Sequence, residues 1–382
     1  MALEIMSFDV LHKEFNSTNN VSSFVSSNQN AINYLLIRSL DKPHLIDLLN
    51  DRNVPFDAEA NKKIEDLYRI VYLLNLEQKD LIAFIKKKYP EVKKSRLESE
   101  QGLNELLKQF GNVRCGLRND RLDAEVQKVI RNKSIRSWDE LSKAFESLVI
   151  KARQYAEWSY VNQASTDLIE HFVNDHENVI PTLRKIPHVD FFYNFEGVGL
   201  VPFDLKITNI SEDYFNEVEI KLYEQSCNQL LRECFKNIKK TDKSLPVLSI
   251  FDSTEELYEF MVDLSSRHKC IDEVLNKIKK IRNQTVIDLM ADRRTLELWN
   301  YVNQGPRLFC NNNRFFVFLA YKNNFGDARG LKKKVELIGN LITNHLTQLK
   351  FNNLNNHDYT YDEEIQLRGN YSTTSSSVLL AE

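Results

Sequence analysis

The sequence predicts an α/β (α+β) protein in which a mixed sheet flanked by helices is preceded by an all-α N-terminal domain. From about residue 31 to 150, apolar residues recur at spacings of three and four, which is typical of amphipathic helices. After about residue 151, short apolar runs of strand type alternate with helical segments. A chain of 382 residues is also long enough for two or three domains. We therefore expect a helical domain over residues 1–150, an α/β domain over 151–350 and a polar tail over 351–382.

The N-terminal domain is predicted as a series of amphipathic helices that follows a polar lead-in over residues 15–30. Some of these helices open with residues that cap a helix N-terminus. Ser137, with Glu140 three residues on, forms a capping-box pattern. The helical pattern is seen in six segments: INYLLIRSL, HLIDLL, IEDLYRIVYLL, KDLIAFIKKKY, LNELLKQF and WDELSKAFESLVIKA.

The α/β domain is predicted to begin with a helix around ASTDLIEHFVNDH. Later helices are expected over about 212–239, over 254–302 and in GLKKKVELIGNLITNHL. Residues Phe315 to Leu319 form an unbroken apolar run, which favours an interior strand. Beyond about residue 350 the chain is rich in polar residues, which is typical of a mobile tail. Strands are expected near residues 179–183, 186–193, 199–209, 246–251 and 314–321.

The composition is that of a globular protein with a sizeable core, with 42% apolar and 27% charged residues. A net charge of −3 does not by itself indicate a nucleic-acid binder. The five cysteines form no CxxC pair, and the N-terminus lacks the pattern of a signal peptide. No window approaches the roughly 18 uncharged apolar residues that a membrane span needs. We therefore expect a cytoplasmic protein without a membrane segment.

Charged residues stand inside an apolar hairpin over Val189–Asn209, VDFFYNFEGVGLVPFDLKITN. A charge within such a run is costly unless it is paired, bound to a metal or open to a cleft. Because side chains alternate along a strand, Asp204 and Lys206 point to one face, roughly 6.6 Å apart. A turn near the middle of the hairpin can bring Asp190 alongside them. The sequence therefore predicts two carboxylates and an ammonium at one end of a small sheet.

This set of groups is suited to metal-dependent chemistry on a phosphodiester. Two carboxylates, completed by waters and phosphate oxygens, suit octahedral Mg²⁺. The ion polarises a phosphodiester and lowers the pKa of a bound water, and a nearby lysine can orient that water. Pro202 fits the same picture, because a proline inside a strand marks an edge or a bulge where a side chain can be re-aimed.

The pattern resembles the PD-(D/E)XK nuclease superfamily, to which restriction endonucleases belong. Thirteen residues separate Asp190 from Asp204-Leu205-Lys206, and Val189 stands where the nominal motif has Pro. The resemblance covers about residues 155–350 and does not extend to the N-terminal helices. It implies that Asp190 and Asp204 hold Mg²⁺, for which Mn²⁺ can substitute, and that Lys206 positions or activates the attacking water.

The resemblance also implies a further acid on the helix before the hairpin, and the matching residue is Glu170 in STDLIEHF. This residue would assist in holding the metal. On the predicted helix, Glu170 shares its polar side with Asp167 and Glu177. The residues alone do not rank these three acids, and only the resemblance favours Glu170.

The same residues also have interpretations in which they play only a structural role. Asp204 and Lys206 are also compatible with a surface pair on an edge strand, and Glu170 with a solvated helix face. A zinc site made of His171, His176 and His188 is not favoured, because the spacing of five puts the first two on different sides of a helix. No Gly-rich phosphate loop, GxSxG or HExxH motif is present, so ATP-driven and nicotinamide chemistry are not expected.

The sequence is thus interpreted as a metal-dependent endonuclease of restriction-enzyme type that hydrolyses phosphodiester bonds in double-stranded DNA. The helical domain would contact DNA or make a homodimer, and the resemblance also allows a cognate methyltransferase as a partner. Two alternatives stay open: a non-cleaving DNA-binding or defence scaffold protein, and a repair or RNA nuclease on the same fold. Basic clusters that could contact phosphates occur at 86–88 with 93–96, 236–243, 277–282 and 332–334.

Overall fold

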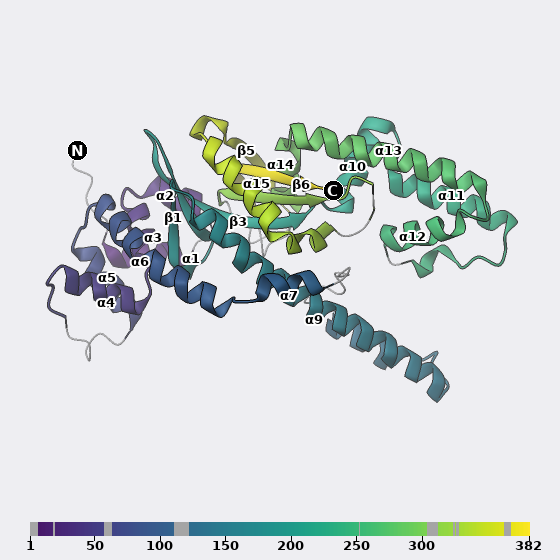
Figure 1. Cartoon of the computed structure of the whole chain (residues 1–382), viewed down its shortest axis with the longest axis horizontal. Helices are drawn as coiled ribbons and strands as arrows, with labels where there is room; N and C mark the ends of the chain where they lie inside the picture. Colours follow the sequence, from purple (N-terminus) through teal and green to yellow (C-terminus); the bar gives the residue numbers. More distant parts are fainter. Residues whose placement is uncertain are drawn as a thin grey trace.

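The structure is a computed structural model that describes residues 7–17, 20–56, 63–110, 122–251, 253–303, 312–323, 325, 328–362 and 368–382. It contains one six-stranded mixed sheet with helices against both faces. A helical N-terminal region lies at one end of this sheet, and a second group of helices lies at the other end (Figure 1). The predicted mixed α and β architecture with N-terminal helices is therefore confirmed at this coarse level.

The sheet joins an antiparallel meander to parallel strands. Its order is β1-β2-β3-β4-β6-β5, with β1–β2, β2–β3 and β5–β6 antiparallel and β3–β4 and β4–β6 parallel. Strand β4 is buried along its whole length, as its unbroken apolar sequence predicts. The strands are β1 (Val179–Ile186), β2 (Val189–Phe195), β3 (Gly199–Asn209), β4 (Arg314–Ala320), β5 (Asn355–Tyr361) and β6 (Gly369–Ala381).

The N-terminal helices share a hydrophobic core with the meander. Buried Tyr34 and Tyr68 belong to the same cluster as Ile180 of β1 and Phe192 of β2. The helices are α1 (Phe8–Ser17), α2 (Val21–Ser27), α3 (Ala31–Arg38), α4 (Lys42–Asp51), α5 (Ile64–Leu73), α6 (Gln78–Ser99) and α7 (Leu103–Gln109). They also cover the outer edge of β1, where Arg184 N donates to Ser39 O at 2.7 Å. Covering an edge strand protects its backbone groups from pairing with other chains.

Helix α9 (Trp138–Asn174) is 37 residues long and follows α8 (Leu122–Ile130). It begins with the predicted capping box of Ser137 and Glu140. No Pro or Gly interrupts it, so the expected domain boundary near residue 150 falls inside a continuous helix. Its C-terminal half packs on the sheet together with α15 (Val335–Gln348).

The helices between β3 and β4 are α10 (Glu212–Tyr223), α11 (Cys227–Thr241), α12 (Thr254–Leu264), α13 (Lys269–Ala291) and α14 (Arg294–Asn303). Of these, α10, α14 and the C-terminal part of α13 pack on the opposite face of the sheet, whereas α11 and α12 form a separate core with α13. Buried Arg282 of α13 ties the group together, because its guanidinium bonds Glu212 and Glu219 of α10 at 2.7–3.0 Å. The aromatic rings of Phe215 and Phe325 lie within 4.3 Å of the same guanidinium.

Three predictions about secondary structure are wrong. Residues 15–30, expected as a polar lead-in, contain the end of α1 and the whole of α2, because the Asn20 side chain caps α2 and Val21 and Phe24 are buried in the core.

The segment expected as a strand near 246–251 contains a short 3₁₀ turn at Leu248–Ile250, and Ile250 is exposed. It is a short apolar run between Pro246 and the Ser253 cap of α12, and among the described strands none pairs with it. Residues 351–382, expected as a mobile polar tail, contain β5 and β6, and β6 lies inside the sheet between β4 and β5. Its Ser and Thr side chains are buried because they have hydrogen-bond partners there.

Candidate active site

The β2–β3 hairpin places the two predicted aspartates next to each other. The last backbone pair of the two strands is Phe191 with Phe203, and one step further Asp190 stands across from Asp204. At this point the carboxylate of Asp190 replaces a backbone acceptor, because its Oδ2 accepts the hydrogen bond of Leu205 N at 2.7 Å. The structure therefore brings Asp190 and Asp204 together where the two strands diverge.

Lys206 follows Asp204 on the same side of β3. The residues that alternate with them on this strand belong to the other face, where Phe203 and Ile207 are buried in the core beneath α9 and α15. Asp204 and Lys206 are both half-buried. Strand β3 lies between the N-terminal helices and α10–α13 (Figure 1). Two carboxylates and an ammonium thus share one partly open stretch of the sheet, as predicted from strand alternation.

Arg314 is a site residue that sequence reasoning missed. It opens β4 directly beside Asp204, and its Nε lies 3.1 Å from Asp204 Oδ2. Its side chain is only 2% exposed, and its guanidinium lies 5.0 Å from the centre of the Tyr301 ring. In the sequence, the only feature that could have indicated Arg314 as a site residue was its charge at the start of the apolar RFFVFLA run. The parallel pairing that joins positions 110 residues apart was not available from the sequence.

The ionisation of Asp190 depends on its surroundings. Burial, together with the nearby carboxylates of Asp204 and Glu170, raises its pKa to about 7, against the lowering effects of the Leu205 N–H and Lys185. Two carboxylates that share a partly buried site resist full ionisation unless a cation lies between them. Half of the Asp190 side chains would therefore carry a proton near neutral pH when no cation is bound.

Glu170 lies on α9 at the border of this site. Its Oε1 is 3.5 Å from Lys185 Nζ of β1, and the same ammonium is 3.5 Å from Asp167 Oδ1. Burial raises the pKa of Glu170, whereas Lys185 lowers it. Of the three helix acids left open by the sequence, Glu170 is the one that acts on the pKa of Asp190. Glu177 lies beyond the end of α9 and is exposed.

His188 also borders the aspartates. It occupies the tight turn between β1 and β2 with a positive φ of 64°, a conformation that few non-glycine residues adopt. Burial lowers its pKa, whereas the charge of Asp204 raises it. The other two histidines of the disfavoured zinc reading lie elsewhere. His171 Nε2 is 2.7 Å from Glu100, and His176 stacks on Tyr193.

A metal ion would find two carboxylates here. Within the described ranges there is no group of three or more His, Cys, Asp or Glu side chains placed to hold a metal ion. Mg²⁺ keeps several waters and commonly uses only one or two carboxylates together with substrate phosphates. The oxygen donors of Asp190 and Asp204, with the raised pKa of Asp190, fit that requirement. Glu170 as a direct metal ligand stays a prediction.

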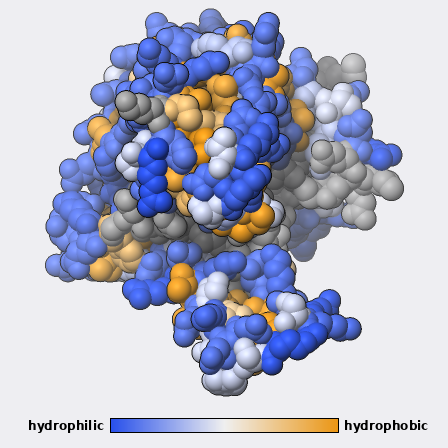
Figure 2. Space-filling view, turned by 90° about the vertical axis from the view of Figure 1, so that its right-hand side faces the viewer, coloured by the Kyte–Doolittle hydropathy of each residue, from blue (hydrophilic) through white to orange (hydrophobic). Residues whose placement is uncertain are grey.

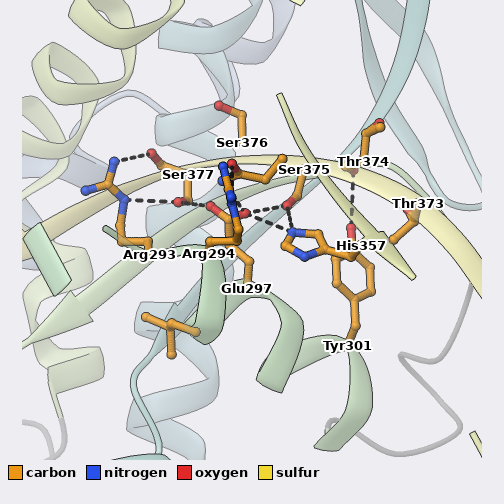
Figure 3. A network of polar contacts seen from close by, with 12 residues as sticks. Arg293, Arg294, Glu297, Tyr301, His357, Thr373, Thr374, Ser375, Ser376 and Ser377 are labelled. Atoms are coloured by element: carbon orange, nitrogen blue, oxygen red, sulfur yellow. Dashed lines mark hydrogen bonds and ion pairs between the residues drawn. The ribbon is translucent and has the colours of Figure 1, made fainter. Parts of the chain in front are cut away.

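A buried polar network fixes the strands next to the site (Figure 3). Its centre is Glu297 of α14, whose carboxylate accepts from Ser375 Oγ at 2.6 Å and Asn355 Nδ2 at 2.8 Å and also bonds Ser377. His357 Nε2 lies 3.1 Å from Glu297 and 2.8 Å from Ser375 Oγ. Because one nitrogen faces both groups, these residues do not form a relay in which the acid and the hydroxyl bond opposite ring nitrogens.

The network continues to the start of β4. Ser375 pairs with Arg314 in the β4–β6 register, and Tyr301 OH donates to Asn312 O at 2.9 Å. Arg293 Nε also donates to Ser377 Oγ at 3.0 Å (Figure 3). These bonds hold the beginning of β4, and with it Arg314, at a fixed position beside Asp204.

Most of the predicted basic clusters are engaged within the molecule. On α6, Lys88 and Lys93 form ion pairs with Asp47 and Asp175 at 2.6 and 2.7 Å. Near α15, buried Lys332 donates to Asn162 Oδ1 at 2.6 Å. Exposed lysines occur on the neighbouring helices α11 and α13: Lys236, Lys240, Lys277 and Lys280. These two helices are thus a better candidate for phosphate contacts than α6.

Comparison with family models, with curated proteins and with solved structures found no match for this chain. Among the helices that the structure describes, none is sufficiently long and apolar to cross a membrane.

Proposed function

We propose that the protein is a metal-dependent endonuclease that hydrolyses phosphodiester bonds in double-stranded DNA, of the restriction-enzyme type within the PD-(D/E)XK superfamily. The observation that carries this proposal is the pairing of Asp190 with Asp204 at the end of the β2–β3 ladder, with Lys206 on the same strand face. The order of helix, antiparallel meander, helices and parallel strand, in a mixed sheet flanked by helices, supports the same proposal.

Each side chain of the site has a role in this proposal. Asp190 and Asp204 would hold Mg²⁺ or Mn²⁺, which when bound polarises the phosphodiester and lowers the pKa of its water. Lys206 orients the water that attacks phosphorus and balances the charge of the phosphate. Arg314 keeps Asp204 in place through its short ion pair. Glu170, held by Lys185, adds negative charge at the border of the site.

The DNA duplex would be held by contacts away from the reacting groups. The exposed lysines on α11 and α13 supply positive charge on one side of the sheet. The N-terminal helices lie on the other side of strand β3 (Figure 1). A duplex that reaches Asp190 and Asp204 would therefore lie between the two helical groups.

Cleavage of supercoiled plasmid with Mg²⁺ tests the proposal. The wild-type protein should nick or linearise plasmid with Mg²⁺ or Mn²⁺, and EDTA should abolish this activity. Ca²⁺ should support it poorly, because Ca²⁺ favours larger and more flexible coordination. Asp204→Ala, Asp190→Ala and Lys206→Ala should each reduce the cleavage rate by about 100-fold or more, as expected for the loss of a catalytic group. DNA binding should persist in each variant.

Asp358→Asn is the matched control, because Asp358 is an exposed carboxylate on β5 of the same sheet. It should leave cleavage unchanged. Full activity of Asp204→Ala, or full activity of wild type in EDTA, would show that the carboxylates do not serve a metal-dependent reaction.

A second candidate function is a non-cleaving DNA-binding or scaffold protein. The close Arg314–Asp204 pair favours this alternative, because it satisfies Asp204 without a metal. DNA binding without any Mg²⁺-dependent nicking would support this alternative over the nuclease. Comparing duplex DNA, nicked or damaged DNA and RNA as substrates would separate a restriction nuclease from a repair or RNA nuclease.

A further inference from the structure

The first half of α9 projects from the body of the molecule as a helical arm (Figure 1). We define this arm as residues 138–156, which span about 28 Å at the rise of an α-helix. From the side, the arm forms a separate lobe with apolar surface between polar atoms (Figure 2). Apolar residues on a projecting helix are costly in water unless another surface covers them.

Three of the exposed apolar residues of the arm lie on one stripe, and a fourth, Ile150, lies on a neighbouring face of the helix. Trp138 is 73% exposed, Phe145 44% and Val149 66%. Steps of seven and four residues place these three side chains above one another on one helix face. The small residues Ser142, Ala152 and Ala156 belong to the same stripe by the same spacing. The stripe thus carries its large side chains in the N-terminal part and its two alanines at the C-terminal end, over about five turns.

Helix α8 covers a different side of the arm. Lys151 Nζ reaches Glu125 Oε2 of α8 at 2.9 Å, and Val129 of α8 lines a hollow together with Ala144 and Leu148 of the arm. Residues 144, 148 and 151 lie on the flank next to the stripe by helical spacing. The stripe is therefore left exposed beside a helix pair that is already formed.

We propose that the stripe is the self-association surface of this protein, and that the arms of two copies pair antiparallel about a two-fold axis near residue 147. This register places Trp138 of one copy level with Ala156 of the other, and Phe145 level with Val149. The large Trp138 ring then faces the small Ala156 at each end of the pair, and Phe145 packs on Val149 near the axis. An isologous pairing of this kind closes as a dimer.

Charge and dipoles fit the same register. Asp139 of one arm lies within about one turn of Arg153 of the other, at both ends of the pair. Within a single copy, Arg153 makes an exposed surface ion pair with Glu157. Antiparallel helices also set opposite ends of their macrodipoles side by side. Glu146 lies near the axis and faces its own counterpart, so this residue opposes pairing.

The exposed parts of Trp138, Phe145 and Val149 supply the apolar area of the contact. An aromatic side chain can bury about 150–250 Å². Two copies of Trp138 and Phe145, joined by Val149, therefore bring the contact toward the roughly 1,000 Å² expected of a biological interface. The proposal concerns the arm alone and does not depend on the proposed nuclease function.

Sedimentation equilibrium over a range of concentrations tests the pairing. Wild type should dimerise, and Val149→Asp should raise the dimer dissociation constant by at least about tenfold, because it buries an unpaired charge. Glu146→Gln should lower the dissociation constant. Leu222→Asp, an exposed apolar position on α10, is the matched control and should leave it unchanged. Circular dichroism checks that each variant is folded.

Disulfide cross-linking tests the direction of pairing. Phe145→Cys and Val149→Cys are made separately, with Cys115 and Cys270 replaced by Ser. A mixture of the two variants should form a cross-linked dimer under oxidation, and neither variant alone should do so. A monomer at all concentrations, a dimer insensitive to Val149→Asp, or cross-linking by Phe145→Cys alone would each overturn the antiparallel arm pair.

Discussion

Asp190 links the charge of the candidate site to the stability of the fold. Its pKa of about 7 in the folded chain lies above the ordinary value near 3.8, chiefly because the side chain is buried. Between these two pH values the folded state holds a proton that the unfolded state has released. Stability from this group is therefore present at low pH and is lost as the pH rises toward 7, at about 1.4 kcal/mol per pKa unit.

We predict that Asp190→Asn removes this loss. The amide keeps an oxygen that can accept from Leu205 N, but it does not ionise. The variant should gain up to a few kcal/mol in unfolding free energy relative to wild type at pH 8, and much less at pH 4. Urea unfolding at the two pH values measures this difference.

The ionisation of Asp190 also predicts how a bound cation affects the stability of the fold. Mg²⁺ should raise the melting temperature of wild type at pH 8, because it binds the ionised pair in the folded state. Asp190→Asn should show a smaller rise, and Asp358→Asn should match wild type. An equal gain of Asp190→Asn at pH 4 and pH 8 would mean that Asp190 is not the titrating group.

The Arg314–Asp204 pair makes a second prediction at the residue scale. Arg314→Met should destabilise the protein by about 3 kcal/mol, because it leaves a partly buried carboxylate without its partner. Asp204→Asn should also destabilise it, since buried Arg314 then keeps a charge without a counterion. The double variant should be more stable than the sum of the two losses implies, and a double-mutant cycle in urea measures this coupling. Strict additivity would show that the pair contributes nothing.

Among the elements, the contact between α9 and α15 positions the helix that carries Glu170. Gly339 of α15 lies against the ring of Phe172 of α9, and a Cβ at position 339 would come within 2.3 Å of that ring. The glycine is needed for this close approach and not for a special backbone conformation. A helix would otherwise favour Ala over Gly by about 1 kcal/mol.

We predict that Gly339→Ala destabilises the protein by about 1–3 kcal/mol in spite of the better helix propensity, because the Phe172 ring must move. Thermal or urea unfolding measures the loss. Phe172→Leu should restore part of the stability when combined with Gly339→Ala, because the smaller side chain leaves room for the methyl group. A stabilised Gly339→Ala variant would mean that α9 and α15 are not in close contact.

At the scale of the whole molecule, the C-terminal strand completes the sheet. Strand β6 pairs with β4 on one side and β5 on the other, and buried Val378 belongs to the main sheet core. The N-terminal helices, the meander and the C-terminal strand therefore depend on one another through a single sheet.

We predict that Val378→Asp prevents cooperative folding, because it buries a charge without a partner in the central sheet. Asn370→Asp, on the exposed end of the same strand, should have little effect, since either side chain can accept from Thr360 Oγ1. Far-ultraviolet circular dichroism and urea unfolding compare the two variants. A Val378→Asp protein with wild-type stability would contradict the placement of β6.

The sequence by itself determined the local features of this protein. Strand alternation was sufficient to put Asp204 and Lys206 on one face, and the capping box located the start of α9. The hairpin brought Asp190 beside Asp204, because two consecutive strands with a short turn pair with their neighbours in the chain. Each of these features depends on interactions over a few residues or across one turn.

Only the tertiary structure decided what lies next to the hairpin. Arg314 reaches Asp204 through parallel pairing of strands far apart in the chain, and composition gives no register for such a pair. Ser375 and Ser377 read as a polar tail, yet the buried carboxylate of Glu297 accepts their hydroxyl hydrogen bonds inside the core. A polar side chain is buried or exposed according to whether a distant partner can satisfy it, and that partner is specified by the fold.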